Sequence, residues 1–143
     1  MFLRKKITGK LLIIYIPAQI LGCLLGVMLA NVFFEHNILE LSTKNRDGFH
    51  IFLSEIIATF GLIFIIFATL KDGKITIAAS VATYIMAGYW FTSSTSFANP
   101  AVAIARTFTD SFTGINYMNT PTYILAEFLG ALIAVFLIKK LIK

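Results

Sequence analysis

The sequence predicts an all-α transmembrane protein with four spanning helices and one re-entrant half-helix. Hydrophobic residues make up 58% of the 143 residues and charged residues only 13%, whereas a soluble domain has about a quarter charged residues. A soluble fold of this size would expose a large apolar surface, so lipid is the expected solvent. Four stretches have the length of roughly 17–25 largely apolar residues that a membrane-spanning helix needs, and a fifth is about half as long.

The first apolar stretch covers residues 11–34 and follows a basic segment, residues 1–10. A basic segment before an apolar run also describes a secretory signal peptide. This run is too long for the apolar region of a signal peptide, and no small-residue cleavage site closes it, so we expect a retained membrane helix. Cys23 is the only cysteine of the chain. It cannot form an internal disulfide, so we expect a small, buried apolar role.

The other three predicted spans are residues 51–70, 75–91 and 122–138. Glu55 is the only charge in the second span, and Glu127 is the only charge in the fourth. An acidic side chain inside the bilayer is costly, so each of these acids is expected to have hydrogen-bond partners within the protein. We interpret Glu127 as a structural residue.

Lysine and arginine residues are unequally divided among the segments that join the predicted spans. The N-terminal tail, the loop at residues 71–74 and the C-terminal tail hold nine of them, whereas the other two loops hold three. The positive-inside rule therefore places both termini in the cytoplasm, which requires an even number of spans. The net charge of +5 is then a topology signal in the plasma membrane and does not indicate nucleic-acid binding; the expected partner is the lipid bilayer.

Residues 92–114 form a segment too long for a tight turn and too apolar for an ordinary solvated loop. Asn99 is a favoured helix N-cap, and Pro100 suits the first helical position. A short helix that continues to about Phe108 would be roughly 13 Å long, about half of the hydrocarbon core. Irregular backbone at membrane depth must be buried in protein or line water. We therefore expect the hydroxyls and carbonyls of residues 92–96 to line a wet path.

The chemistry of this segment favours the passage of neutral solutes. The N-terminus of the half-helix carries a partial positive charge, and the Asn99 amide can donate a hydrogen bond to a water or hydroxyl oxygen. Together they favour neutral, oxygen-bearing solutes and repel cations and protons. We predict no enzyme activity, cofactor or metal, because the sequence has no paired acids, nucleophile–base set or phosphate-binding loop. His36 and His50 are interpreted as solvated loop residues, with a metal or pH role as the alternative.

Around Asn99-Pro100-Ala101 and its half-helix, the sequence resembles the second Asn-Pro-Ala loop of the aquaporin, or major intrinsic protein, family. The whole chain, residues 1–143, resembles the C-terminal half of that family as a single membrane domain. The resemblance implies a channel for passive transport of water or small neutral solutes such as glycerol or metalloid acids. Glu55 matches the glutamate that braces the backbone of this loop in the family; a helix-packing acid with its own partner is the alternative.

Val102 departs from the pattern of most family members, which have at this position an arginine that forms the narrow selectivity filter. The run of residues 99–106 resembles a less common bacterial branch that is associated with metalloids or other non-water solutes. The opposing filter position would lie near Ala87 or Gly88. Both residues are small, so the resemblance implies a wide pore.

Arg106 follows Val102 by one helical turn. It either replaces part of the missing charge or, as we favour, reaches the lipid headgroups or pairs with Asp110. The predicted pore residues are Asn99, Pro100, Ala101, Val102, Ala87, Gly88 and Arg106.

The family has six helices and two half-helices, and the resemblance covers only the second half of that pattern. The chain is expected to lack the first two helices and the first Asn-Pro-Ala loop. Oligomers are expected, but two copies of one chain share a topology whereas the halves of the family are inverted, so a complementary N-terminal half is the better partner. Alone, the chain is expected to conduct poorly. The alternative function is a truncated, non-conducting membrane fragment or an assembly subunit.

Overall fold

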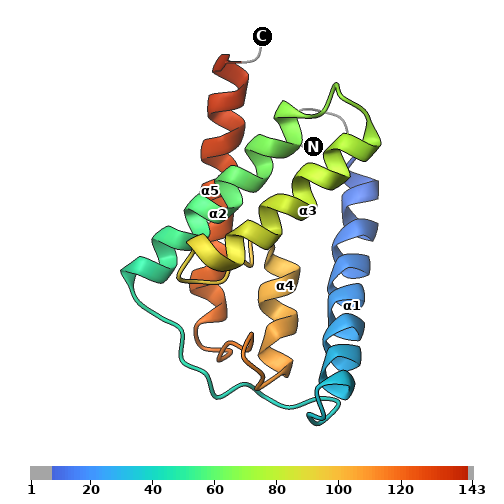
Figure 1. Cartoon of the computed structure of the whole chain (residues 1–143), viewed down its shortest axis with the longest axis vertical. Helices are drawn as coiled ribbons and strands as arrows, with labels where there is room; N and C mark the ends of the chain where they lie inside the picture. The colour runs from blue at the N-terminus through green and yellow to red at the C-terminus, as the bar shows by residue number, and fades with distance from the viewer. Residues whose placement is uncertain (1–7, 142–143) are drawn as a thin grey trace. The chain divides into compact units, whose positions relative to one another are not determined.

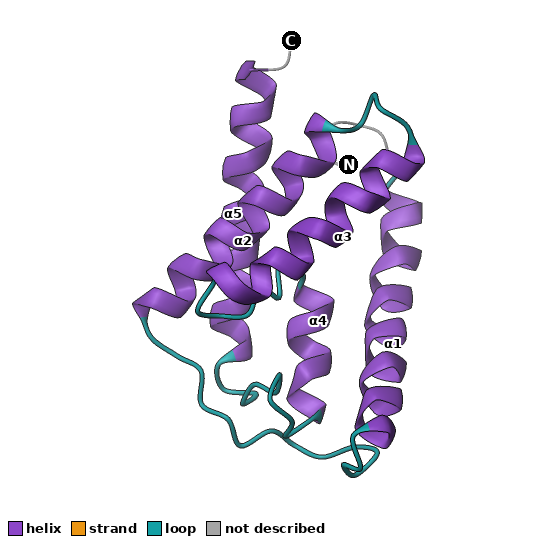
Figure 2. Ribbon diagram, viewed as in Figure 1, coloured by secondary structure: helices purple, strands orange, loops and turns teal. Residues whose placement is uncertain are grey.

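The computed structural model describes residues 8–141 of the chain (Figure 1). Its helices are, in chain order, α1 (Gly9–Phe33), α2 (Phe49–Ala68), α3 (Lys74–Phe91), α4 (Pro100–Ala105), the 3₁₀ helix η2 (Arg106–Phe108) and α5 (Thr120–Leu141). The described residues contain no β-strand (Figure 2), which confirms the predicted all-α class. The predicted orientation also uses residues that lie outside this range, namely Arg4, Lys5, Lys6 and Lys143.

Three helices are long and apolar enough to cross a membrane: Gly9–Phe33, Phe49–Ala68 and Thr120–Lys140. They correspond to the first, second and fourth predicted spans. The third predicted span forms α3, an 18-residue helix. It is not one of the three, because Lys74 and several hydroxyl-bearing side chains dilute its apolar residues. The crossing of the membrane by α3 therefore stays a prediction.

The chain folds as two compact units, and each is described by itself. The first unit contains residues 8–44 and 101–117, and the second contains residues 45–100 and 118–141. The boundary in the sequence falls between Pro100 and Ala101, so α4 has residues in both units.

In the second unit, α2 and α5 pack closely along their lengths. Gly130 of α5 permits this approach, because a Cβ atom at that position would collide with the carbonyl oxygen of Ile56 on α2. Small residues at such crossings let helix backbones touch within a membrane. Farther along the pair, the buried side chains of Phe67, Ala134 and Ile138 form an apolar core.

Tyr84 joins α3 to α2 within the second unit. Its hydroxyl donates a hydrogen bond to the carbonyl oxygen of Ala58 at 3.0 Å. The ring occupies the space that a side chain at Gly61 would fill, and its edge meets Phe91 with ring centroids 5.7 Å apart. The contacts with Ala58 and Gly61 hold α3, from which the candidate site loop departs, against α2.

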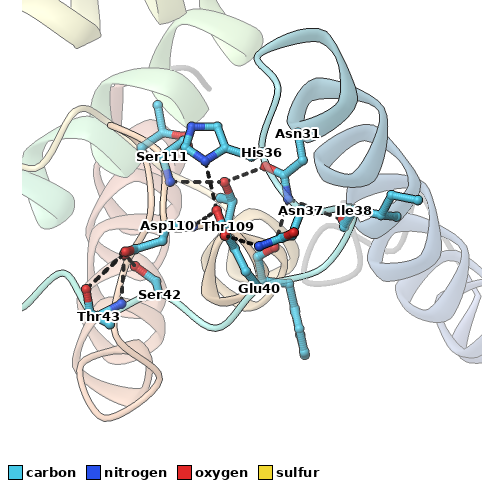
Figure 3. Close-up of polar contacts among 12 residues, drawn as sticks. Asn31, His36, Asn37, Ile38, Glu40, Ser42, Thr43, Thr109, Asp110 and Ser111 are labelled. Atoms are coloured by element: carbon cyan, nitrogen blue, oxygen red, sulfur yellow. Dashed lines mark hydrogen bonds and ion pairs between the residues drawn. The ribbon is translucent and has the colours of Figure 1, made fainter.

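In the first unit, Asn31 holds the end of α1 to the chain that follows η2 (Figure 3). Its side chain is buried, with 2% exposure. The amide nitrogen donates to the carbonyl oxygens of Ile38 at 3.2 Å and Phe108 at 3.1 Å. The amide oxygen accepts from the Thr109 hydroxyl at 2.6 Å. A buried polar residue near the end of a largely apolar helix thus joins that helix to the segment after η2.

Candidate functional site

The loop of residues 92–99, in the second unit, connects α3 to α4 and is almost entirely buried. The exposed fraction of Ser94 is 0%, and those of the next four residues stay at or below 8%. Thr95, Ser96 and Ala98 have positive φ angles of 66°, 50° and 51°. Each left-handed residue other than glycine costs on the order of 1 kcal/mol or more. Contacts from the surrounding helices must therefore hold the loop in this conformation.

Glu55 of α2 provides the first of these contacts. Its side chain is fully buried. One carboxylate oxygen accepts a hydrogen bond from the backbone N–H of Phe97, and the other accepts from the N–H of Ala98, both at 2.9 Å. Hydrogen bonds to a charged acceptor are among the stronger ones in proteins. The structure thus places Glu55 against the backbone of the loop.

Glu127 of α5 holds the next residue of the loop. Its Oε1 atom accepts from the backbone N–H of Asn99 at 3.0 Å. Its Oε2 atom is buried and has no hydrogen-bond partner among residues 8–141. Sequence reasoning interpreted Glu127 as structural but did not connect it to Asn99. The sequence contained one signal for this contact: an acidic residue inside an apolar helix requires a hydrogen-bond partner.

These two acids determine where the loop carbonyl groups point. Three successive backbone N–H groups, those of residues 97–99, face Glu55 and Glu127. In a trans peptide the C=O bond points opposite to the N–H bond, and the described chain has no cis peptide. The carbonyl oxygens of Ser96, Phe97 and Ala98 therefore form a row that points away from the acids.

Gly88 lies where α3 passes beside this loop. A Cβ atom at Gly88 would be 2.6 Å from the Ser96 hydroxyl oxygen, so glycine permits the close approach. The carbonyl oxygen of Gly88 also accepts from the Thr92 hydroxyl at 2.6 Å. Its neighbour Ala87 is exposed. The assignment of Ala87 and Gly88 to a pore wall stays a prediction.

Arg46 also contacts the loop, and sequence reasoning counted it only as a loop charge. Its Nη1 atom donates to the Ser94 carbonyl oxygen at 3.3 Å and to the Thr95 hydroxyl at 3.1 Å. Its backbone N–H donates to the side chain of Asn119 at 3.1 Å. No spacing rule could have found these contacts, because nearly fifty residues separate Arg46 from the loop.

The half-helix begins at Pro100, directly after the half-buried Asn99. Ala101 is buried and Val102 is half-buried. Six residues are α-helical and the next three form η2, so the helical segment ends at Phe108 as expected. The predicted continuous helix changes from α to 3₁₀ geometry at its end, because N–H groups from other segments donate hydrogen bonds to its last carbonyl groups.

Those carbonyl groups lie in the first unit. The carbonyl oxygens of Arg106, Thr107 and Phe108 accept hydrogen bonds from backbone N–H groups outside the helix. The donors are Ile115, Ser42 and Glu40, respectively. The orphan carbonyl groups at the end of a helix are thereby satisfied by neighbouring loops. The loop of residues 35–44 is joined to the half-helix in this way.

Asp110 follows this segment and binds the loop of residues 35–44 (Figure 3). Its carboxylate accepts from the backbone N–H of Thr43 at 2.8 Å and from the hydroxyls of Thr43 and Ser42. The Thr43 N–H is the main cause that holds the pKa of Asp110 below its usual value. The half-buried side chain of Arg106 lies in the same unit, and both interpretations given above for it stay predictions.

Within residues 8–141, no three histidine, cysteine, aspartate or glutamate residues lie in a group that could hold a metal ion. His36 instead contacts Glu40, with 2.9 Å between Nδ1 and Oε1 (Figure 3).

The sequence profile of the major intrinsic protein family matches residues 1–137. The chain belongs to this family. Aquaglyceroporin AqpS from Rhizobium meliloti (strain 1021) is 43% identical over 129 residues, which are 90% of this chain and 55% of that protein. The chain therefore spans about half the length of the curated relative it matches. No solved structure matches the chain.

Membership of the major intrinsic protein family confirms the resemblance found in the sequence. Together with the apolar helices, it identifies the chain as a multi-pass membrane protein. The family consists of channels and transporters and not of enzymes, in agreement with the prediction that this chain catalyses no reaction.

Proposed function

We propose that this chain forms one half of a membrane channel for small neutral solutes, and that the loop of residues 92–99 lines the solute path. One observation carries the proposal. Glu55 and Glu127 together hold three successive amides of a buried, strained loop, so its carbonyl oxygens face the other way. A scaffold would have no need of a strained loop at this depth, whereas a solute path needs ordered acceptors.

In this proposal α3 also spans the membrane, which gives four spans together with α1, α2 and α5, and α4 with η2 is a re-entrant half-helix. Nine helical residues at about 1.5 Å each reach roughly half-way through the hydrocarbon core. The pore residues are those expected from the sequence: Asn99, Pro100, Ala101, Val102, Ala87, Gly88 and Arg106. Glu55 supports them from behind the loop.

We infer that the solutes include polyols of about the size of glycerol, or neutral metalloid acids, in addition to water. The name of the relative, an aquaglyceroporin, supports this choice at 43% identity. Val102, Ala87 and Gly88 are all smaller than arginine, and small residues leave a wide pore.

The partner in this proposal is a complementary N-terminal half, with both termini in the cytoplasm and the assembly in the plasma membrane. The chain spans about half of its relative, and the two halves of an inverted repeat differ in topology. The alternative function, a non-conducting assembly subunit, requires that no such assembly transports solute.

The test is glycerol flux into proteoliposomes that contain the chain alone or with a complementary N-terminal half from a family member. We expect fast flux only with both halves, and a loss of roughly five- to tenfold in Asn99→Ala, the effect of about one hydrogen bond. Asn37→Ala is the matched control, because Asn37 is exposed and bonds only locally to Glu40. If neither preparation exceeds empty vesicles, the channel proposal fails for this chain.

A further inference from the structure

The row of carbonyl oxygens at Ser96, Phe97 and Ala98 carries partial negative charges that attract cations. Backbone carbonyl groups replace the water around a cation, and channels that conduct cations use such rows. A pore that is lined by carbonyl groups rejects cations more strongly when a fixed positive charge lies near them, in addition to the partial charge of the half-helix N-terminus. Val102 stands where most family members have an arginine, so such a charge would come from another residue of this chain.

Arg46 lies at one end of this row within the second unit. Its guanidinium donates to the carbonyl oxygen of Ser94 and to the hydroxyl of Thr95, which directly precede the row. Both acceptors are buried, with exposed fractions of 0% and 8%. Arg46 is itself half-buried, so solvent screens its charge less than that of an exposed loop residue.

Hydrogen bonds hold both the backbone and the side chain of Arg46 in place. The backbone N–H of Arg46 donates to the side chain of Asn119, which directly precedes α5. The side chain spans from there to the loop. An arginine fixed in this way is preorganised, because its planar group loses little further freedom when a solute arrives.

We propose that Arg46 is a selectivity-determining residue that supplies, beside the carbonyl row, the positive charge missing at Val102. This inference rests on the proposed channel function. The guanidinium repels cations of any kind and leaves neutral polyols and oxyacids free to pass. Arg46 also contacts Thr95, whose backbone is left-handed, so a role in shaping the loop must be separated from selectivity by experiment.

The experiment compares two fluxes into proteoliposomes that hold the chain and its complementary half. Glycerol is the neutral probe and radiolabelled guanidinium, a permanent cation of similar size, is the charged probe. The measured quantity is the ratio of guanidinium to glycerol flux. If Arg46 only maintained the shape of the loop, its substitution would change both fluxes together and leave this ratio unchanged.

Three variants at this position separate charge from hydrogen bonding. Arg46→Gln keeps an amide donor but removes the charge, and Arg46→Lys keeps the charge but loses the planar group. Loss of a nearby unit charge should raise the ratio about tenfold in Arg46→Gln and Arg46→Ala. The ratio in Arg46→Lys should stay within about threefold of the wild type, since a lysine charge is less well fixed.

Lys44→Ala is the matched control, because it removes an exposed positive charge two residues away. It should leave the ratio unchanged. If Arg46→Gln conducts glycerol with the wild-type ratio, the proposal is overturned, and it is equally overturned if Lys44→Ala changes the ratio as much. A wild-type assembly without glycerol flux would refute the channel function first, and this inference with it.

Discussion

Two buried carboxylates on facing helices share three backbone amides, but they do so unequally. Glu55 uses both oxygens, one for Phe97 and one for Ala98. Glu127 uses one oxygen for Asn99, and its second oxygen has no hydrogen-bond partner among the described residues. A buried polar group left without a partner is costly. The two residues should therefore respond differently when each acid is replaced by its amide.

We expect Glu127→Gln to keep at least half of the glycerol flux and the full thermal stability in detergent, because the glutamine oxygen still accepts from Asn99. Glu55→Gln should be destabilised by about 1–3 kcal/mol, because its NH₂ group cannot accept and one buried backbone donor is left unpaired. The measurement is thermal unfolding of each variant beside its flux. Equal damage in both variants would contradict this assignment of roles.

At the scale of elements, the sequence predicts the helices well and their contacts poorly. The predicted spans at residues 51–70, 75–91 and 122–138 begin within two residues of α2, α3 and α5, because an apolar run in lipid has few alternatives to a helix. The segment after Asn99 is helical to Phe108, also as predicted. The change from α to 3₁₀ could not be predicted, since it depends on donors from the loop of residues 35–44.

The contacts of the candidate site could not be predicted from the sequence either, because they join residues that are far apart in the chain. Glu55 meets a loop that lies more than forty residues later, and Glu127 meets one that lies 28 residues earlier. No periodicity connects positions so far apart. The resemblance named Glu55 because a family pattern contains it, whereas Arg46 and the link from Glu127 to Asn99 needed coordinates.

The Asp110 carboxylate joins the loop of residues 35–44 to the segment that follows the half-helix. This contact should weaken in acid. Hydrogen bonds from Thr43 hold the pKa of Asp110 below its usual value of 3.8. A depressed pKa means that the contact is fully stabilising above that value and is lost as the pH falls through the lower pKa of the folded state. We expect the Thr43 amide to lose protection from hydrogen exchange, after correction for intrinsic rates, only below about pH 4.

Asp110→Asn should weaken this protection at pH 7 and remove its dependence on acid. Asp47→Asn is the control, because Asp47 is exposed and accepts a hydrogen bond from its near neighbour Asn45. Full protection of Thr43 in Asp110→Asn at pH 7 would show that the carboxylate does not hold the loop of residues 35–44 at the end of the half-helix.

For the whole molecule, the decisive property is the number of times the chain crosses the bilayer between α2 and α5. If α2 and α3 both span and residues 92–108 return to the side they entered, then Phe112 lies on the same side as Asp47. A complete crossing by residues 92–108, or a failure of α3 to span, places Phe112 on the side of Asp72. The positive-inside rule assigns Asp72 to the cytoplasm.

Single cysteines at Asp47, Asp72 and Phe112, introduced into a Cys23→Ala background, distinguish these topologies. All three positions are exposed, so a membrane-impermeant maleimide can reach each from its own side. In intact cells that contain both halves of the channel, we expect labelling at Asp47→Cys and Phe112→Cys, and labelling at Asp72→Cys only after permeabilisation. Phe112→Cys that labels together with Asp72→Cys would show that residues 92–108 do not re-enter from the side of Asp47, which contradicts the solute path proposed here.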